Sequence, residues 1–276
     1  MPNNIAAEVT DTNTVEARIR SGAVNRERAW RIGFFTVMPG VILFLVLVGF
    51  TRSLYARPLF HPDPIPPYLY LHGIVLTSWF VLAFVQALLI STGRVESHRR
   101  IGAVGACFAA AVFAAALMAT FGSVTRRGFD LNAPASIIGI GIMGITVAQF
   151  TSGVVWNNMV SAVSFALFVA GAVIYRRRPV IHKRFMLLAS ISILGPALAR
   201  ISRWPHFGGE QGPFIPIVTW SLIVAVAIYD VISRKRLETC TAIAIVWLLI
   251  IRNAAVYISQ THFGLSLIYA LGRLRH

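Results

Sequence analysis

The sequence predicts an all-α integral membrane protein with about seven transmembrane helices and one further helix that is re-entrant or packed without spanning. Two observations lead to this class. Of the 276 residues, 57% are hydrophobic and only 13% are charged, which is about half the charged fraction of a soluble domain. The charges are also bunched between apolar runs that reach the roughly 20 residues a helix needs to cross a bilayer.

The formal net charge of +15 fits the same class. Arginine and lysine flank the apolar runs, where they mark cytoplasmic loops and contact anionic lipid headgroups. We therefore expect anionic headgroups, and not nucleic acid, as the partners of these cations. Cys107 and Cys240 lie far apart in the chain, so they predict neither a disulfide framework nor a CxxC metal site.

Three parts follow each other along the chain. Residues 1–31 are polar with five arginines and are expected to form a cytoplasmic tail. Residues 32–259 form the helical bundle, and residues 260–276 form an amphipathic segment that lies on the membrane surface. The predicted spans cover about 32–50, 68–91, 101–121, 153–175, 184–201, 214–232 and 241–259.

The stretch 134–175 is apolar for 42 residues, which is enough for two crossings or for one crossing and a buried segment. With one crossing, 16 of the 25 cations lie on one side and 6 lie in the opposite loops. The positive-inside rule favours that arrangement, so 134–153 is expected to be the non-spanning helix. The amino terminus is then cytoplasmic, the carboxyl terminus lies on the opposite face, and the expected location is a bacterial inner membrane.

Span three carries a stripe of small residues, Gly102, Ala106, Ala110 and Ala114. Small residues let membrane helices approach closely. We therefore expect this stripe to be a packing face and span three to be the centre of the bundle.

Three polar side chains on span two, His72, Trp79 and Gln86, are spaced seven residues apart. A helix returns almost to the same face after seven residues, and unpaired polar groups are costly in lipid. These groups are therefore expected to point into the bundle. They either hydrogen-bond neighbouring helices or line a path for a ligand or protons.

Two similar basic motifs, His98-Arg99-Arg100 and His182-Lys183-Arg184, each follow the turn of a hydrophobic hairpin. Both are expected at the cytoplasmic edge. One interpretation is that they only anchor loops in the headgroups. The other is that the two imidazoles bind one haem b or another metal, with Arg99, Arg100 or Arg184 pairing with the haem propionates.

Three more charged residues lie within spans. Asp230, the only acidic residue there, is expected either to pair with a cation such as Arg100 or Arg184 or to handle protons. Arg200 and Arg252 lie inside the outer ends of their spans. They are expected either to bind an anionic headgroup or substrate or to reach the surface.

The segments Tyr70-Leu71-His72-Gly73, His98-Arg99-Arg100-Ile101-Gly102 and His182-Lys183-Arg184-Phe185-Met186, together with Trp79 and Gln86, resemble a family of uncharacterised bacterial multi-pass membrane proteins. The resemblance covers about residues 65–260 and implies a fold without an established activity. More distantly, the histidines at matching depth are similar to those of transmembrane b-type cytochromes, which implies haem.

These features favour an integral membrane protein of redox or accessory character, with haem b bound near the cytoplasmic face. Two alternatives remain. The chain is a scaffold subunit of a respiratory or photosynthetic complex without chemistry of its own, or it is a proton-coupled transporter that uses Asp230, His72 and Gln86. The sequence contains no paired carboxylates and no phosphate-binding glycine loop, which argues against a hydrolase or a kinase.

Overall fold

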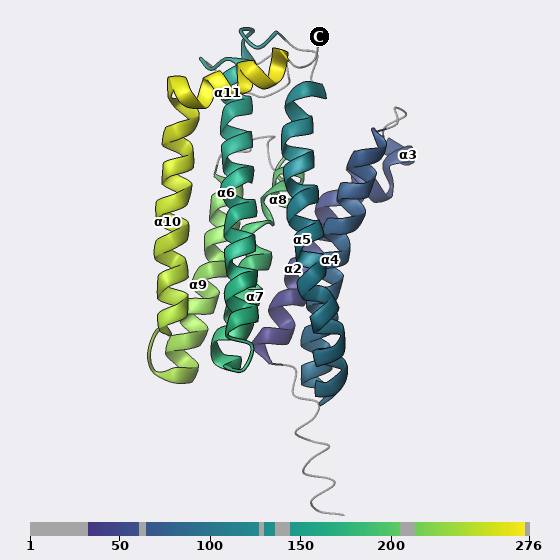
Figure 1. The fold of residues 1–276 in the computed structure, drawn as a ribbon, viewed down its shortest axis with the longest axis vertical. Helices are drawn as coiled ribbons and strands as arrows, with labels where there is room; N and C mark the ends of the chain where they lie inside the picture. Colours follow the sequence, from purple (N-terminus) through teal and green to yellow (C-terminus); the bar gives the residue numbers. More distant parts are fainter. Residues whose placement is uncertain (1–32, 61–64, 127–129, 136–143, 205–212, 274–276) are drawn as a thin grey trace, which may run out of the picture.

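The computed structural model describes residues 33–60, 65–126, 130–135, 144–204 and 213–273. Within these ranges the regular structure is helical, apart from one isolated bridge between Pro134 and Thr146 (Figure 1). The elements are α2 (Phe34–Phe50), the π-helix η1 (Thr51–Tyr55), α3 (Arg57–Phe60), α4 (Pro67–Ser91), α5 (Val95–Arg126), α6 (Val147–Ile174), α7 (Pro179–Ser192), α8 (Gly195–Ile201), α9 (Phe214–Arg234), α10 (Thr239–Gln260) and α11 (His262–Arg273).

The predicted fold class is confirmed. Six helices are long and apolar enough to cross a membrane, and α7 with α8 makes a seventh if the two are counted as one bent span. The axes of α7 and α8 differ by 46°. The break falls where Pro196 follows Gly195, because a proline near the start of a helix removes a backbone donor and favours a new helix start.

Three hairpin turns lie at one end of the bundle, which we call the basic end (Figure 1). They are the α4–α5 turn at 92–94, the α6–α7 turn at 175–178 and the α9–α10 turn at 235–238. These turns carry arginine and lysine residues, and α2 also begins at this end. The surface helix α11 lies across the opposite end (Figure 1), as an amphipathic terminal segment predicts.

The centre of the bundle is α6, and not the third span as expected. Helix α6 packs against α5, α7, α10 and α11. On α5 the buried positions include Gly105, Ala109 and Val112, whereas Ala110 and Ala114 of the predicted stripe are exposed. Small residues permit close packing but do not require it, and two of these four face away from the other helices.

The stretch 134–153 also differs from the expectation in its described part. Residues 136–143 lie outside the described residues, and Val147 to Gly153 form the first turns of α6. A capping box starts this helix, in which Thr146 and Gln149 satisfy each other's backbone N–H groups. The residues from Val147 onward therefore belong to a long spanning helix. The predicted tail 1–31 also lies outside the described residues.

Candidate functional site

The rings of His98 and His182 lie next to each other at the basic end. Their centroids are 6.2 Å apart and their planes are nearly perpendicular, at 89°. Both side chains are partly buried. Two histidines that are 84 positions apart in the sequence thus meet on different helices, as expected from their parallel motifs.

Each histidine is placed by the way its helix begins. Gly93, with a φ of 75°, reverses the chain after α4, and α5 starts two residues later, so that His98 lies in its first turn. Pro179 occupies the start of α7, and His182 follows within the first turn. Both rings therefore stand at the same depth, just inside the basic end.

The orientation of the His182 ring is set by the preceding helix. Its Nδ1 atom lies 2.8 Å from the carbonyl oxygen of Ala172. A carbonyl only accepts hydrogen bonds, so Nδ1 carries the proton and donates. The Nε2 atom of His182 then has its lone pair available, which is the usual arrangement in a histidine that binds a metal.

His98 contacts the side chain of Gln86 on α4. When the Gln86 amide is oriented so that its oxygen accepts from the N–H of Gly102 at 3.1 Å, its nitrogen donates to Nδ1 of His98 at 2.5 Å. The same nitrogen donates to the backbone carbonyl oxygen of His98 at 3.1 Å, whereas the reverse orientation places the Gln86 oxygen against that carbonyl and the nitrogen against the N–H of Gly102. In the satisfied orientation Nδ1 of His98 is therefore the acceptor, and Gln86 orients this ring.

The spacing of the two rings is compatible with a shared metal ion. With a metal–nitrogen bond of about 2 Å, an imidazole centroid lies about 3 Å from the metal. Two imidazoles on opposite sides of one metal then have centroids about 6 Å apart, and two in a tetrahedral site about 5 Å. The observed separation of 6.2 Å is close to the first of these two values.

A tetrahedral all-protein metal site is not supported. Among the described residues no group of three or more histidine, cysteine or carboxylate side chains could hold a metal ion. The donor set at the basic end consists of two imidazoles, which is the set expected for the axial positions of a haem.

Arg184 does not contribute to this site. It is 1% exposed and forms a buried ion pair with the fully buried Asp230, in which its Nε donates to Oδ1 at 2.8 Å. Thr241 donates to Oδ2 of Asp230 at 2.6 Å, and the backbone N–H of Glu238 approaches the same oxygen at 3.4 Å. The predicted pairing of Asp230 with Arg184 is confirmed, and it ties α7, α9 and α10 together.

The remaining cations near the histidines are at the surface. Arg100 pairs with Glu96 one turn earlier, and both side chains are more than three-quarters exposed. Arg99 is also exposed. The ammonium group of Lys183 lies 4.3 Å from the centre of the Phe35 ring.

The polar stripe of α4 points into the bundle as predicted. Trp79, which is 1% exposed, donates from its indole N–H to Ser190 at 3.2 Å. His72 makes a 2.9 Å hydrogen bond between Nδ1 and the carbonyl oxygen of Ala115. Ala115 is 17 residues beyond His98 on α5, or about 25 Å along the axis, so His72 does not join the His98–His182 pair.

Arg200 and Arg252 lie toward the other end and form no common site with the histidine pair. Arg200 donates from Nε to Ser53 at 3.0 Å, and its guanidinium lies 4.3 Å from the centre of the Phe50 ring. Arg252 is partly buried on the side of α10 that carries the buried Leu248 and Ala255. Arg200 therefore has a structural role at the junction of α8 with the end of α2.

Two partners in these networks were not predicted. The carbonyl oxygen of Ala172 orients His182. Every residue has a backbone carbonyl, so the residue type at this position does not predict the contact. Thr241 donates a further hydrogen bond to Asp230. Hydroxyl side chains are common in membrane spans, so the sequence does not distinguish Thr241 as a partner of Asp230.

Comparisons with family models, curated proteins and solved structures find no match to this chain.

Proposed function

We propose that this protein is a membrane-embedded redox protein that binds haem b near the basic end of the bundle, with His98 and His182 as the two axial ligands. The observation that carries the proposal is the 6.2 Å separation of the two imidazole centroids, which is the spacing expected for two rings on opposite sides of one metal. Haem b held by these residues would supply one-electron transfer at a potential set by its ligands and surroundings.

The residues around the pair have the roles that such a site requires. Ala172 fixes the tautomer of His182 by accepting from Nδ1. Binding of a metal by Nε2 of His98 would require Gln86 to turn its amide, so that its oxygen accepts from Nδ1 and its hydrogen bond with the N–H of Gly102 is given up. Outer hydrogen bonds of this kind orient the ligand rings and raise their basicity.

The packing around the pair is compatible with a planar group between the rings. Helices α5 and α7 do not pack closely against each other, whereas α4 and α6 contact α5 and α6 contacts α7 extensively. The two histidines thus come from helices that are neighbours across a looser contact. Such an arrangement lets two ligands stand apart without breaking a tight helix–helix interface.

Arg99 and Arg100 are the proposed partners of the haem propionates. Both are exposed at the basic end, and the solvated pair of Arg100 with Glu96 contributes little stability, so Arg100 can exchange this partner for a propionate. Arg184 is not a partner of the propionates in this proposal, because it forms the buried ion pair with Asp230. We further propose that the basic end faces the cytoplasm of a bacterial inner membrane, by the positive-inside rule.

An absorption spectrum of the protein tests the proposal. The chain is produced in cells supplied with a haem precursor, purified in mild detergent, and measured before and after reduction with dithionite. We expect a Soret band and a sharp α band on reduction, and a pyridine haemochrome typical of haem b. His98→Ala and His182→Ala should each abolish the six-coordinate spectrum.

His262→Ala is the matched control, because His262 is an exposed histidine at the far end of the bundle. It should leave the spectrum unchanged. Protein that is well folded and monodisperse but shows no Soret band would refute haem binding. Unchanged spectra in both His98→Ala and His182→Ala would refute these residues as the ligands.

A further inference from the structure

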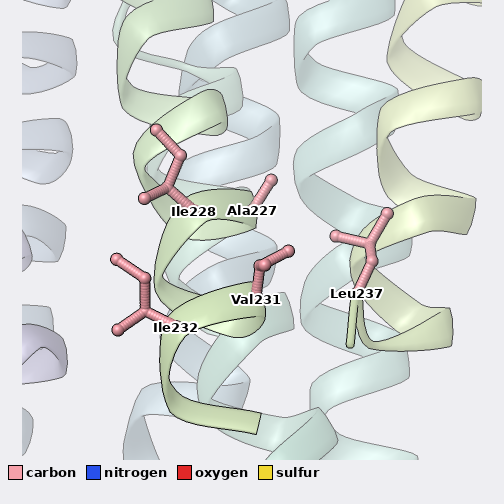
Figure 2. A pocket seen from close by; sticks show the side chains of 5 residues that line it. All are labelled: Ala227, Ile228, Val231, Ile232 and Leu237. Carbon is pink, nitrogen blue, oxygen red and sulfur yellow. The ribbon is translucent and has the colours of Figure 1, made fainter. Parts of the chain in front are cut away.

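A second feature of the basic end is an apolar hollow on the outer side of the α9–α10 hairpin. It has a volume of about 300 Å³ and is lined by Ala227, Ile228, Val231, Ile232 and Leu237. Figure 2 shows Ala227 and Val231 on the side of α9 toward Leu237, which stands at the turn, whereas Ile228 and Ile232 extend from the other side of the helix. The lining contains no polar side chain.

The hollow faces away from the bundle. Ile228, Val231 and Ile232 are each more than half exposed. The opposite side of α9 is the buried one, with Ile223, Val226 and Asp230 packed inward. In a membrane, a concave apolar surface at this position contacts hydrocarbon chains.

The turn directly after the hollow is strongly basic. Arg234, Lys235 and Arg236 follow Ile232 within one helical turn. Arg234 pairs with Glu238 at 2.9 Å. Lys235 and Arg236 are exposed, and within the part of the chain that the structure describes no side-chain hydrogen bond or ion pair is formed by either of them.

We propose that this hollow and the two cations form a binding site for one anionic phospholipid. The acyl chain lies against Ile228, Val231 and Leu237, and the headgroup phosphate lies between Lys235 and Arg236. Lys235 caps α9 four residues after Val231, about 6 Å along the axis, and Arg236 follows it in the turn, so both parts of one amphiphile can be in contact at once. Charge complementarity favours an anionic headgroup over a zwitterionic one.

The shape of the turn supports this site. Lys235 ends α9 in the left-handed conformation, with a φ of 58°. This conformation is unusual for a residue with a side chain, and it reverses the chain so that Leu237 returns to the hollow. The conformation of Lys235 thus places Leu237 in the lining of the hollow, and Lys235 is itself the first of the two exposed cations.

Native mass spectrometry in a mild detergent tests the proposal, with dioleoyl phosphatidylglycerol and dioleoyl phosphatidylcholine as probes of equal chain length. The unmodified protein should bind one phosphatidylglycerol in preference to phosphatidylcholine. Because each cation near the surface contributes about 1 kcal/mol, the double variant K235Q/R236Q should bind phosphatidylglycerol about 25-fold more weakly. Ala227→Leu, which fills the hollow, should weaken binding of both lipids.

The double variant R176Q/R177Q is the matched control. It removes two cations from the other long turn at the same end and should change the affinity less than twofold. Circular dichroism should give the same helix content for all variants, so that a loss of binding is not a loss of fold.

Four outcomes would overturn the proposal. Equal affinities for the two lipids would show that the headgroup charge is not recognised. Full competition by inorganic phosphate would show a phosphate site without a lipid chain. Equal losses in the two double variants would show only a general surface charge, and masses of dimers without lipid would assign the hollow to a second copy of the chain.

Discussion

At the scale of single residues, the pair of Arg184 and Asp230 is the one ion pair of the described residues in which both side chains are buried. Neither side chain is exposed by more than 1%, so neither charge is solvated by water. An uncompensated buried charge costs far more than the pair itself contributes. The pair is therefore a point at which the fold tolerates little change.

Asp230→Leu should destabilise the protein by about 3–5 kcal/mol, because it leaves Arg184 buried without a counter-charge. The free energy of unfolding from a denaturant titration in mixed micelles measures this loss. Replacing both residues, in R184M/D230L, should recover at least half of it, since apolar side chains replace buried ion pairs well. A double variant as unstable as Asp230→Leu alone would contradict this account.

Gln86 offers a second test at this scale, and it depends on the proposed haem. Gln86→Leu removes the hydrogen-bond partner of His98 Nδ1. Loss of an outer hydrogen bond to a metal ligand lowers affinity about 10- to 100-fold, and a haem titration of the apoprotein should show a loss of this size. Gln260→Leu, which removes an amide at the other end of the bundle, should bind haem like the unmodified protein.

Much of this residue-level chemistry was predictable. The common depth of His98 and His182 followed from two motifs placed after two hairpin turns, and the pairing of Asp230 followed from the cost of a lone charge in a membrane. The contact between Gln86 and His98 was not predicted, although the inward direction of Gln86 was. Its target depends on how far α4 and α5 slide along each other, which the seven-residue spacing does not determine.

At the scale of elements, the helix contacts depend on where small residues meet a neighbouring backbone. A Cβ atom on Gly49 would lie 2.5 Å from the carbonyl oxygen of Ala197, so α2 and α8 touch through this glycine. The residue type at such a contact is fixed by the distance between two backbones. The exposed Ala110 and Ala114 on α5 show that the sequence alone does not identify which small residues do this.

Gly49→Ala should therefore destabilise the bundle by about 1–3 kcal/mol, the usual cost of overpacking a close contact. Gly153→Ala is the control within α6, because nothing lies within 4 Å of the added Cβ. Alanine favours a helix over glycine by about 1 kcal/mol, so this variant should be as stable as the unmodified protein or slightly more stable. Thermal unfolding of the two proteins side by side distinguishes these outcomes.

The extents of the helices were predicted well where proline or glycine borders the apolar run, and less well where charged residues extend the helix beyond it. Helix α4 matches its expected span to within a residue. Helix α5 begins six residues before its expected start. Its first turns contain His98 and the neighbouring arginines, which are helical although they precede the apolar run. Hydropathy marks the part of a helix inside the membrane, and not the part that projects from it.

At the scale of the whole molecule, the arrangement of the spans determines whether one site can contain both histidines. Helix α2 begins at the basic end and α11 lies at the other (Figure 1), as an odd number of crossings requires. All three basic turns then share one side of the membrane. The proposed haem site and the proposed lipid site both require this arrangement.

Cysteine labelling in intact cells tests it. In a variant whose Cys107 and Cys240 are replaced by alanine, single cysteines at Arg94, Arg177 and Lys235 should resist an impermeant maleimide until the cells are opened, because the orientation proposed from the positive-inside rule has these turns in the cytoplasm. A cysteine at Ser266 on α11, which is exposed at the far end, should be labelled from outside. If Arg94 and Arg177 react from opposite sides, His98 and His182 cannot share a ligand, because their turns would be separated by the hydrocarbon core of about 30 Å.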